Sequence, residues 1–161
     1  MKRKTPNAER RTPNIEWKNG STGLYLREEG PGYKTAAASA PIETARYDLE
    51  ERLLEFAARI VRLVDALPGT RASNHIAGQL LRCGTSPLAN HGEVEAAESR
   101  NDFIHKLRIC LKELRETSRW LCLLQRVKLV RAAKIQPLIE ETNELVRIFA
   151  SSVRTARKNR T

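Results

Sequence analysis

The residues with the clearest capacity for chemistry are cations that follow one another at helical spacing. They lie four, three, four and seven residues apart: Arg108, Lys112, Arg115, Arg119 and Arg126. In an α-helix this spacing puts the side chains on one face. A row of cations suits contacts with the phosphates of a nucleic-acid backbone, which depend on salt and carry no base specificity. The alternative is a solvated face neutralised by neighbouring acids, because Glu113 and Glu116 flank the row.

A second group of basic residues lies near the C-terminus, where no acid follows Glu144. Its members are Arg147, Arg154, Arg157 and Lys158. The chain of 161 residues has a formal net charge of +10, of which residues 1–46 carry +4 and the remainder +6. This excess favours a polyanionic partner, nucleic acid before an anionic membrane. The alternative is a protein of high isoelectric point with no specific partner.

The elements that must position these cations are helices, because apolar residues recur in alternating steps of three and four. Helices are expected over residues 47–67, 72–97, 100–126 and 132–157. Amphipathic helices bury their apolar stripes against one another, which predicts an all-α fold, an antiparallel up-down four-helix bundle. Such a bundle has a filled core and no built-in cleft. A binding site therefore belongs on the outer surface or between subunits.

Local signals refine this arrangement. Ser99 is a good N-cap for the third helix. Gly84 and Pro87 lie in the middle of the second helix and predict a kink there, with two separate short helices as the alternative. Pro137 lies near the start of the fourth helix, which leaves open a start at Gln136.

One polar residue, Asn90, falls on the apolar stripe of the second helix, with three polar residues beside it: Gln79, Ser86 and Glu93. A polar residue at a core position can fix helix register at some cost in stability, provided that it finds internal hydrogen-bond partners. We therefore interpret this motif as structural. The alternative is a polar site between helices.

Patterns typical of catalysis or metal binding do not occur in the sequence. His75, His91 and His105 are too far apart for metal-ligand spacing, and there is no phosphate-binding glycine loop or nucleophile motif. We expect no enzymatic activity, no metal and no cofactor. The three cysteines show no C-x-x-C spacing, which suggests reduced thiols in a cytoplasmic protein. No apolar run approaches the roughly 20 residues needed to span a bilayer, and no secretory signal begins the chain.

Residues 1–46 differ from the rest of the chain. They hold four of the seven prolines and show no lasting periodicity. We expect a basic, disordered N-terminal extension here, followed by the helical bundle domain over residues 47–161.

Several short segments from Tyr47 onward form a specific combination. They are Leu67-Pro68, Gln79-Leu80-Leu81-Arg82, Ser86-Pro87, Asn90-x-x-Glu93, Ser99-Arg100-x-Asp102-Phe103 and Lys112-Glu113-Leu114-Arg115-Glu116-Thr117. Through them, residues 47–157 resemble the 23S rRNA intervening-sequence proteins. Many members of that family carry a glycine after the glutamate, whereas here Val94 follows Glu93 and Gly92 precedes it. This departure affects the local role of that glycine and not the fold.

The resemblance implies an antiparallel four-helix bundle that assembles into a homopentamer. Some members of the family are encoded within large-subunit rRNA genes. Others are accessory proteins of diversity-generating retroelements, which bind nucleic acid and a reverse transcriptase through a basic surface. The resemblance brings no catalytic residue.

The sequence thus predicts a non-enzymatic, oligomeric bundle that binds RNA or DNA without base specificity. The alternative is a ring-forming protein scaffold whose basic charge is incidental. Oligomerisation is also suggested by apolar residues beside the main stripes, namely Leu54, Ala57, Val64, Ile139, Val146, Ile148 and Val153. A wider core-facing stripe is the alternative explanation for them.

Overall fold

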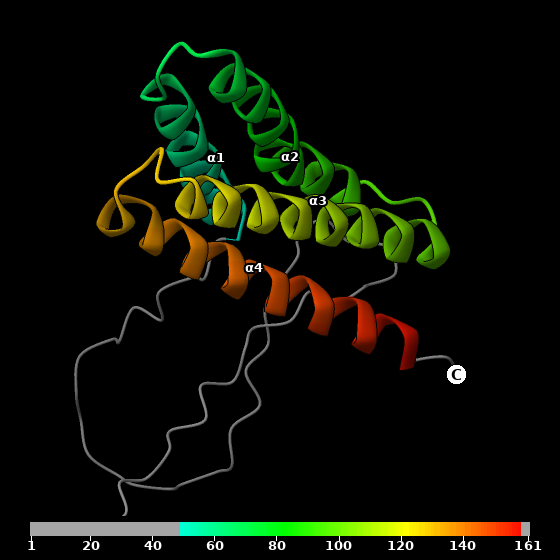
Figure 1. Ribbon diagram of the computed structural model, residues 1–161. Coiled ribbons are helices and arrows are strands. Elements are labelled where there is room, and N and C mark those ends of the chain that lie inside the picture. The colour runs from blue at the N-terminus through cyan, green and yellow to red at the C-terminus, as the bar shows by residue number, and fades with distance from the viewer. Residues whose placement is uncertain (1–48, 159–161) are drawn as a thin grey trace, which may run out of the picture.

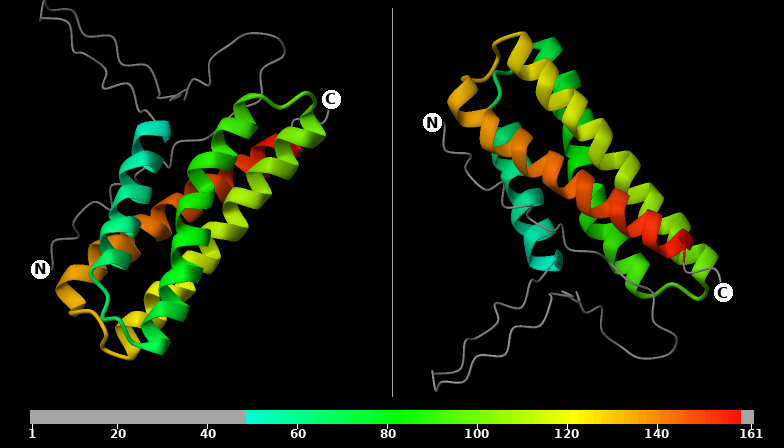
Figure 2. Two further views of the ribbon diagram at one scale, coloured as in Figure 1. Left: turned by 90° about the horizontal axis from the view of Figure 1, so that it is seen from above. Right: turned by 90° about the horizontal axis from the view of Figure 1, so that it is seen from below.

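Four helices make up the part of the chain that the computed structural model describes, residues 49–158 (Figure 1). They are α1 (Leu49–Asp65), α2 (Arg71–Glu95), α3 (Arg100–Arg126) and α4 (Ala132–Lys158). Short links join neighbouring ends, so that the chain turns back after each helix (Figure 2). The all-α bundle expected from the sequence is confirmed. The expectation for residues 1–46 lies outside the described residues.

Helix α2 is a single helix that continues through Pro87, so the alternative of two short helices is wrong. Proline removes one backbone donor from the helix, yet α2 is not interrupted. Pro87 is buried, and its carbonyl accepts a weak hydrogen bond from the Cys110 thiol of α3 at 3.9 Å. The kink at this position stays a prediction. The helix begins one residue earlier than expected because the Thr70 hydroxyl caps it, accepting from the Ser73 amide at 3.2 Å.

Helix α3 begins as the sequence predicts. The Ser99 hydroxyl accepts a hydrogen bond from the Asp102 amide at 3.2 Å, and the Asp102 carboxylate accepts one from the Glu98 amide at 3.3 Å. The two acceptors satisfy donors that the helix leaves unpaired at its start. Helix α4 starts at Ala132, so the alternative start at Gln136 is wrong. The Arg131 carbonyl anchors this first turn by accepting from two amides of α4.

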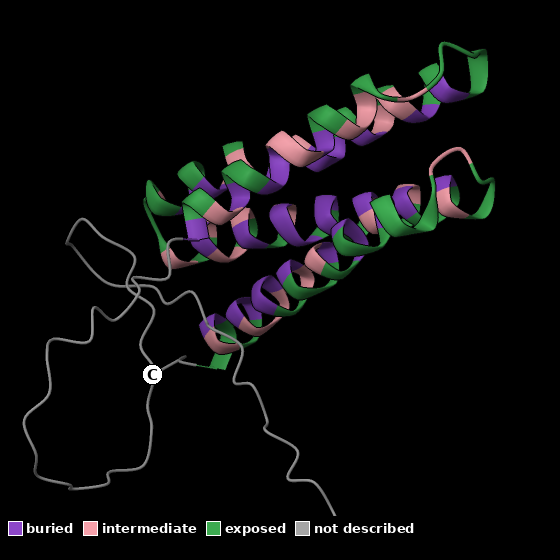
Figure 3. Cartoon of the chain, turned by 90° about the vertical axis from the view of Figure 1, so that its left-hand side faces the viewer, coloured by how far each residue is buried: buried purple, intermediate pink, exposed green. Residues whose placement is uncertain are grey.

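The core lies between the inward faces of the helices, where the predicted stripes are buried (Figure 3). On α3, steps of four and three predict one apolar face, and every residue of it is at most 1% exposed: Phe103, Leu107, Cys110, Leu114, Thr117, Leu121 and Leu124. Helix α3 packs along both α2 and α4, and α1 packs mainly on α2. Between α1 and α4 the principal polar link is Arg52, whose Nε and Nη2 atoms donate to Glu141 (2.5 Å) and Glu144 (2.7 Å). Burial opposes the charge of Arg52, but these two hydrogen bonds outweigh it and raise the pKa of the guanidinium.

Helices α1 and α2 approach closely at Gly84. A Cβ atom on this residue would lie 2.8 Å from Cγ2 and 2.9 Å from Cγ1 of Ile60. Ile60 is completely buried and has no space to move aside. Glycine is therefore required here by packing between helices.

The polar motif on α2 does not form one site. Asn90 is half-buried and bonds within its own helix, donating to the Ser86 carbonyl (2.9 Å) and hydroxyl (2.8 Å). Gln79 accepts from Arg82, and Glu93 pairs with Lys106 of α3 at 3.5 Å. The core position expected for Asn90 belongs instead to His91, which is 3% exposed and packs edge-on against the Phe149 ring. After Pro87 the buried residues of α2 are His91 and Val94, four and then three residues on. The sequence pattern predicts Asn90 and Val94, three and then four residues on.

The additional apolar residues on α1 and α4 mostly widen the core. Ala57, Ile139, Ile148 and Val153 are buried, and Val64 and Val146 are half-buried. Leu54, in contrast, is 49% exposed. Most of these residues therefore pack in the core of one chain and leave only Leu54 of this set as an exposed apolar residue for an interface. Oligomerisation stays a prediction.

Candidate nucleic-acid interface

The predicted row of cations on α3 points outward, away from the core. We call Arg108, Lys112, Arg115, Arg119 and Arg126 the α3 stripe, and all five are exposed. Within residues 49–158, Lys112 is the only member with an ion pair, to Glu113 at 3.7 Å. The four arginines keep their donors available to solvent or to a ligand. The sequence prediction that these residues share one exposed face agrees with the structure.

The two acids that flank the stripe both contact an arginine of α2, and Glu113 also contacts Lys112 of the stripe. Glu116 accepts from Nη2 of Arg82 at 2.6 Å, and Glu113 lies 3.7 Å from Nη1 of the same guanidinium. Glu113 is also 6% exposed, which takes its carboxylate out of the solvated face. An arginine on α2 thus engages the acids that could have neutralised the stripe. The sequence did not reveal this partner, because helix azimuth decides which residues of α2 meet α3.

The basic end of α4 is exposed as well. Arg147 lies 3.9 Å from Glu144, a weak contact between exposed groups. Arg154, Arg157 and Lys158 have no ion pair within the described residues. The C-terminal half of α4 therefore adds a second set of available cations.

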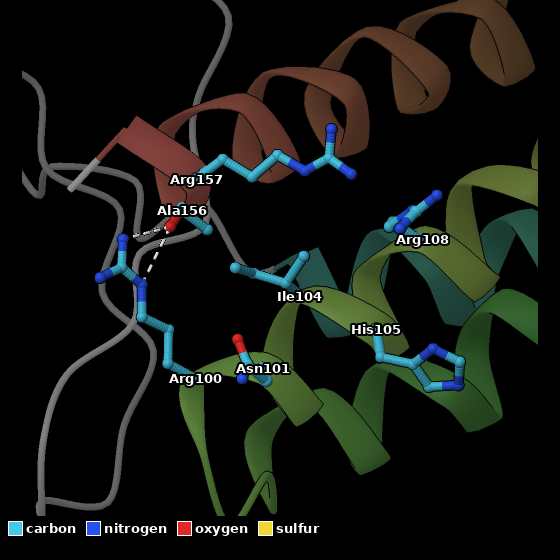
Figure 4. Close-up of a pocket in the computed structure, with 7 residues that line it drawn as sticks. All are labelled: Arg100, Asn101, Ile104, His105, Arg108, Ala156 and Arg157. Carbon is cyan, nitrogen blue, oxygen red and sulfur yellow. Dashed lines mark hydrogen bonds between the residues drawn. The ribbon is translucent and has the colours of Figure 1, made fainter. Parts of the chain in front are cut away.

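One open cavity brings the two basic groups together, at the start of α3 and the end of α4 (Figure 4). Its volume is about 590 Å³. Seven residues line it: Arg100, Asn101, Ile104, His105, Arg108, Ala156 and Arg157. Arg108 belongs to the α3 stripe and Arg157 to the basic end of α4, so the cavity joins both predicted sets. Arg126 lies at the opposite end of α3, about 27 Å from Arg108 at 1.5 Å rise per residue.

Arg100 holds this corner of the fold together. Its Nε atom donates to the Ala156 carbonyl at 3.0 Å, and its Nη2 atom donates to the same oxygen. That carbonyl is among the last of α4, which lack partners within the helix. A cation at the negative end of the α4 dipole is also favourable. The bonds leave three guanidinium N–H groups of Arg100 for other acceptors.

Sequence reasoning missed Arg100 and His105 as members of the basic surface. His105 could have been found, because it lies three residues before Arg108 and continues the same face of α3. Arg100 could not have been found in this way. Its role depends on contact with Ala156, 56 residues away in the sequence.

Two of the three thiols lie in the core, apart from this surface, whereas Cys122 lies on α3 between Arg119 and Arg126, at the spacing that puts it on the same face. All three cysteines are free thiols, of which Cys83 and Cys110 are buried and Cys122 is exposed. Burial raises the pKa of Cys110 to about 12, and burial also raises the pKa of Cys83. Both thiols therefore stay protonated at neutral pH. Between residues 49 and 158, no three histidine, cysteine or acidic residues gather into a metal-binding group. No helix within this range could span a membrane.

Comparison with known proteins identifies the family. The sequence profile of the 23S rRNA-intervening sequence proteins matches residues 47–151, most of the described helices. The chain belongs to this family. A similar solved structure is the crystal structure of a protein of unknown function from Bacteroides thetaiotaomicron, described as belonging to the S23 ribosomal protein family. It is 38% identical, with a TM-score of 0.62 over 66% of this chain and 98% of that chain.

A search of curated proteins finds no match. The family resemblance stated from the sequence motifs is thus confirmed over the bundle. The relation of this 23S rRNA-intervening sequence protein to accessory proteins of diversity-generating retroelements stays a prediction, as do its nucleic-acid and protein partners.

Proposed function

We propose that this 23S rRNA-intervening sequence protein binds the sugar-phosphate backbone of RNA or DNA through the α3 stripe and the basic end of α4. The observation that carries the proposal is the absence of acidic partners for the four stripe arginines within residues 49–158. Cations already paired with carboxylates would lose those pairs on binding phosphate. Unpaired cations lose only water and counterions.

The dimensions of the stripe support a backbone contact of useful length. Arg108 and Arg126 are about 27 Å apart along α3, which corresponds to the rise of about eight base pairs of duplex DNA. The cations form a row and do not cluster at one point. A row can follow a strand of phosphates, whereas a single cluster favours one compact anion.

We expect the activity to be binding without catalysis, in the cytoplasm. Within residues 49–158, His105 and Cys122 are exposed along α3 beside the stripe, but they are about 25 Å apart at 1.5 Å rise per residue and form no nucleophile–base pair. His91 lies in the core, and Cys83 and Cys110 are buried with raised pKa values. No cofactor is included in the proposal.

We further propose that the protein acts as a homo-oligomer, with five subunits as the family resemblance implies. Within the described residues, support comes from exposed apolar side chains on α1, where Leu54 is 49% and Val61 39% exposed. They are seven residues apart and lie on one face. Light scattering at micromolar concentration tests this, and a monomer mass would contradict it.

The same exposed apolar face favours a second function, a protein scaffold that recruits a partner such as a reverse transcriptase. The two functions differ in their dependence on nucleic acid. A scaffold retains its partner in a pull-down from nuclease-treated lysate, whereas an adaptor that works through nucleic acid loses it. A partner retained together with no direct binding of RNA or DNA would favour the scaffold.

The direct test is a binding titration of the purified full chain with fluorescent RNA and DNA over a series of salt concentrations. Phosphate-driven binding gives a logarithm of affinity that falls linearly with the logarithm of salt, and the slope reports the phosphates neutralised. Oligonucleotides of one length and different base sequence should bind with the same affinity. Lack of binding at low salt would refute the proposed function.

A further inference from the structure

The residues that line the cavity at the start of α3 and the end of α4 are rich in cations. Three arginines and a histidine line it from two helices, and no carboxylate does (Figure 4). The carboxylate of Asp102, in the first turn of α3, is engaged elsewhere. Asp102 pairs with Lys106 at 2.9 Å and accepts from the Glu98 amide, and neither acid lines the cavity. The hydrogen bond with Lys106 holds the pKa of Asp102 below its usual value.

The lining residues suit an anion with an attached organic group. Arg100 is fixed in place by its bonds to the Ala156 carbonyl and retains three N–H groups. Arg157 comes from α4, and Arg108 lies about two turns after Arg100 on α3. Cations therefore line the cavity from both helices. Asn101 can supply an amide donor. Ile104 gives an apolar contact, suitable for a sugar or a base beside the phosphate.

We propose that this cavity is a binding site for the terminal phosphate monoester of a nucleic-acid strand. The inference rests on the proposed function and adds recognition of a strand end to it. A terminal phosphate carries a charge of about −1.5 to −2 near neutral pH, against −1 for an internal diester. Guanidinium groups bind such oxygens in bidentate fashion. The cavity adjoins Arg108, the first residue of the α3 stripe, so a strand that follows the stripe reaches it with one end.

The position of α3 adds to the preference for an anion. Asn101 and Arg100 belong to the first turn of α3, where the helix dipole is positive. The negative end of α4 is close by, but Arg100 satisfies its Ala156 carbonyl. Arg100 thus offsets part of the negative potential at the end of α4, and the three arginines make the cavity favourable for an anion.

The test compares oligonucleotides of one sequence and length with three kinds of end: hydroxyl at both ends, a 5′-phosphate, and a 3′-phosphate. The full chain is titrated with each at one fixed salt concentration. We expect one phosphorylated end to bind at least about fivefold more tightly than the hydroxyl form, as for an added charge-assisted contact. The two phosphorylated arms show which terminus enters the cavity.

Two variants link this preference to the cavity. Arg157→Gln removes an exposed cation without an ion pair in the described chain, and should reduce the preference to about onefold. Arg119→Gln is the control, an exposed arginine of α3 that lies outside the cavity. It should weaken all three oligonucleotides alike and leave the preference unchanged. Circular dichroism verifies that both variants keep the helical content of the parent.

The outcomes separate this inference from the proposed function. Salt-dependent binding with no preference for a phosphorylated end would overturn the cavity as a strand-end site and leave the backbone-binding function intact. Equal loss of preference in both variants would also overturn it. No binding of any oligonucleotide at low salt would refute the proposed function, and the strand-end inference with it.

Discussion

Replacing Arg115 and Arg119 together by glutamine is the most decisive perturbation of the proposed interface. Both side chains are exposed, lie one turn apart on α3, and have no ion pair within residues 49–158. Their removal leaves no carboxylate unpaired, so the free energy of unfolding should change by less than about 0.5 kcal/mol per site. A loss of binding can then be attributed to lost phosphate contacts.

The expected magnitude follows from the number of cations in the stripe. If each of its five members neutralises one phosphate of duplex DNA, the salt slope is about −4.5. The double variant keeps three members and a slope of about −2.7. Between roughly 50 and 200 mM salt, affinity should fall about 500-fold for the parent and about 40-fold for the variant. Cations of α4 add equally to both slopes, so the difference of about 1.8 does not depend on them.

The assay is fluorescence anisotropy with one labelled duplex, repeated at five or more salt concentrations. Arg62 and Arg71 supply a control with the same loss of charge, because both are exposed and lie on α1 and α2. Arg62 pairs only with the exposed Glu55 at 3.1 Å, so glutamine there costs little. The control variant should keep the parent slope.

Equal slopes for the two double variants would refute the reasoning. Binding would then follow total charge, and the outward face of α3 would have no special part in it. A parent slope near zero would refute it more completely, because phosphate neutralisation would not drive binding at all.

Three further predictions concern the packing of the bundle. Gly84→Ala should be less stable than Gly78→Ala by about 1–3 kcal/mol in urea unfolding, because only the former meets Ile60 while both gain helix propensity; equal stabilities would contradict the close approach. Arg52→Met should lower the free energy of unfolding by about 1–2 kcal/mol through loss of the link between α1 and α4. With a thiol reagent at pH 8, Cys122 alone should react in the folded protein and all three cysteines after unfolding; fast reaction of a second thiol in the folded chain would show that the core opens.

Much of the fold was predictable because helix formation depends on local spacing. Steps of three and four residues place apolar side chains on one face whatever the neighbouring helices are. The apolar face of α3, from Phe103 to Leu124, follows from this spacing and is buried throughout. Where two neighbouring residues fit the spacing equally well, the spacing alone did not decide which of them is buried. Beyond Pro87 both Asn90 and His91 satisfied the pattern, and contact with Phe149 on α4 accompanies burial of His91.

The candidate site divides in the same way. The sequence by itself determined that the cations of α3 share one face and that the C-terminal half of α4 is basic, since both follow from residue type and helical period. Only the tertiary structure decided that Arg82 of α2 contacts both Glu113 and Glu116, the acids that flank the stripe. It also decided that Arg100 meets the end of α4 and completes a cationic cavity with Arg157. Such contacts depend on the azimuth and offset of packed helices, which arise from the whole core and leave no local signal in the sequence.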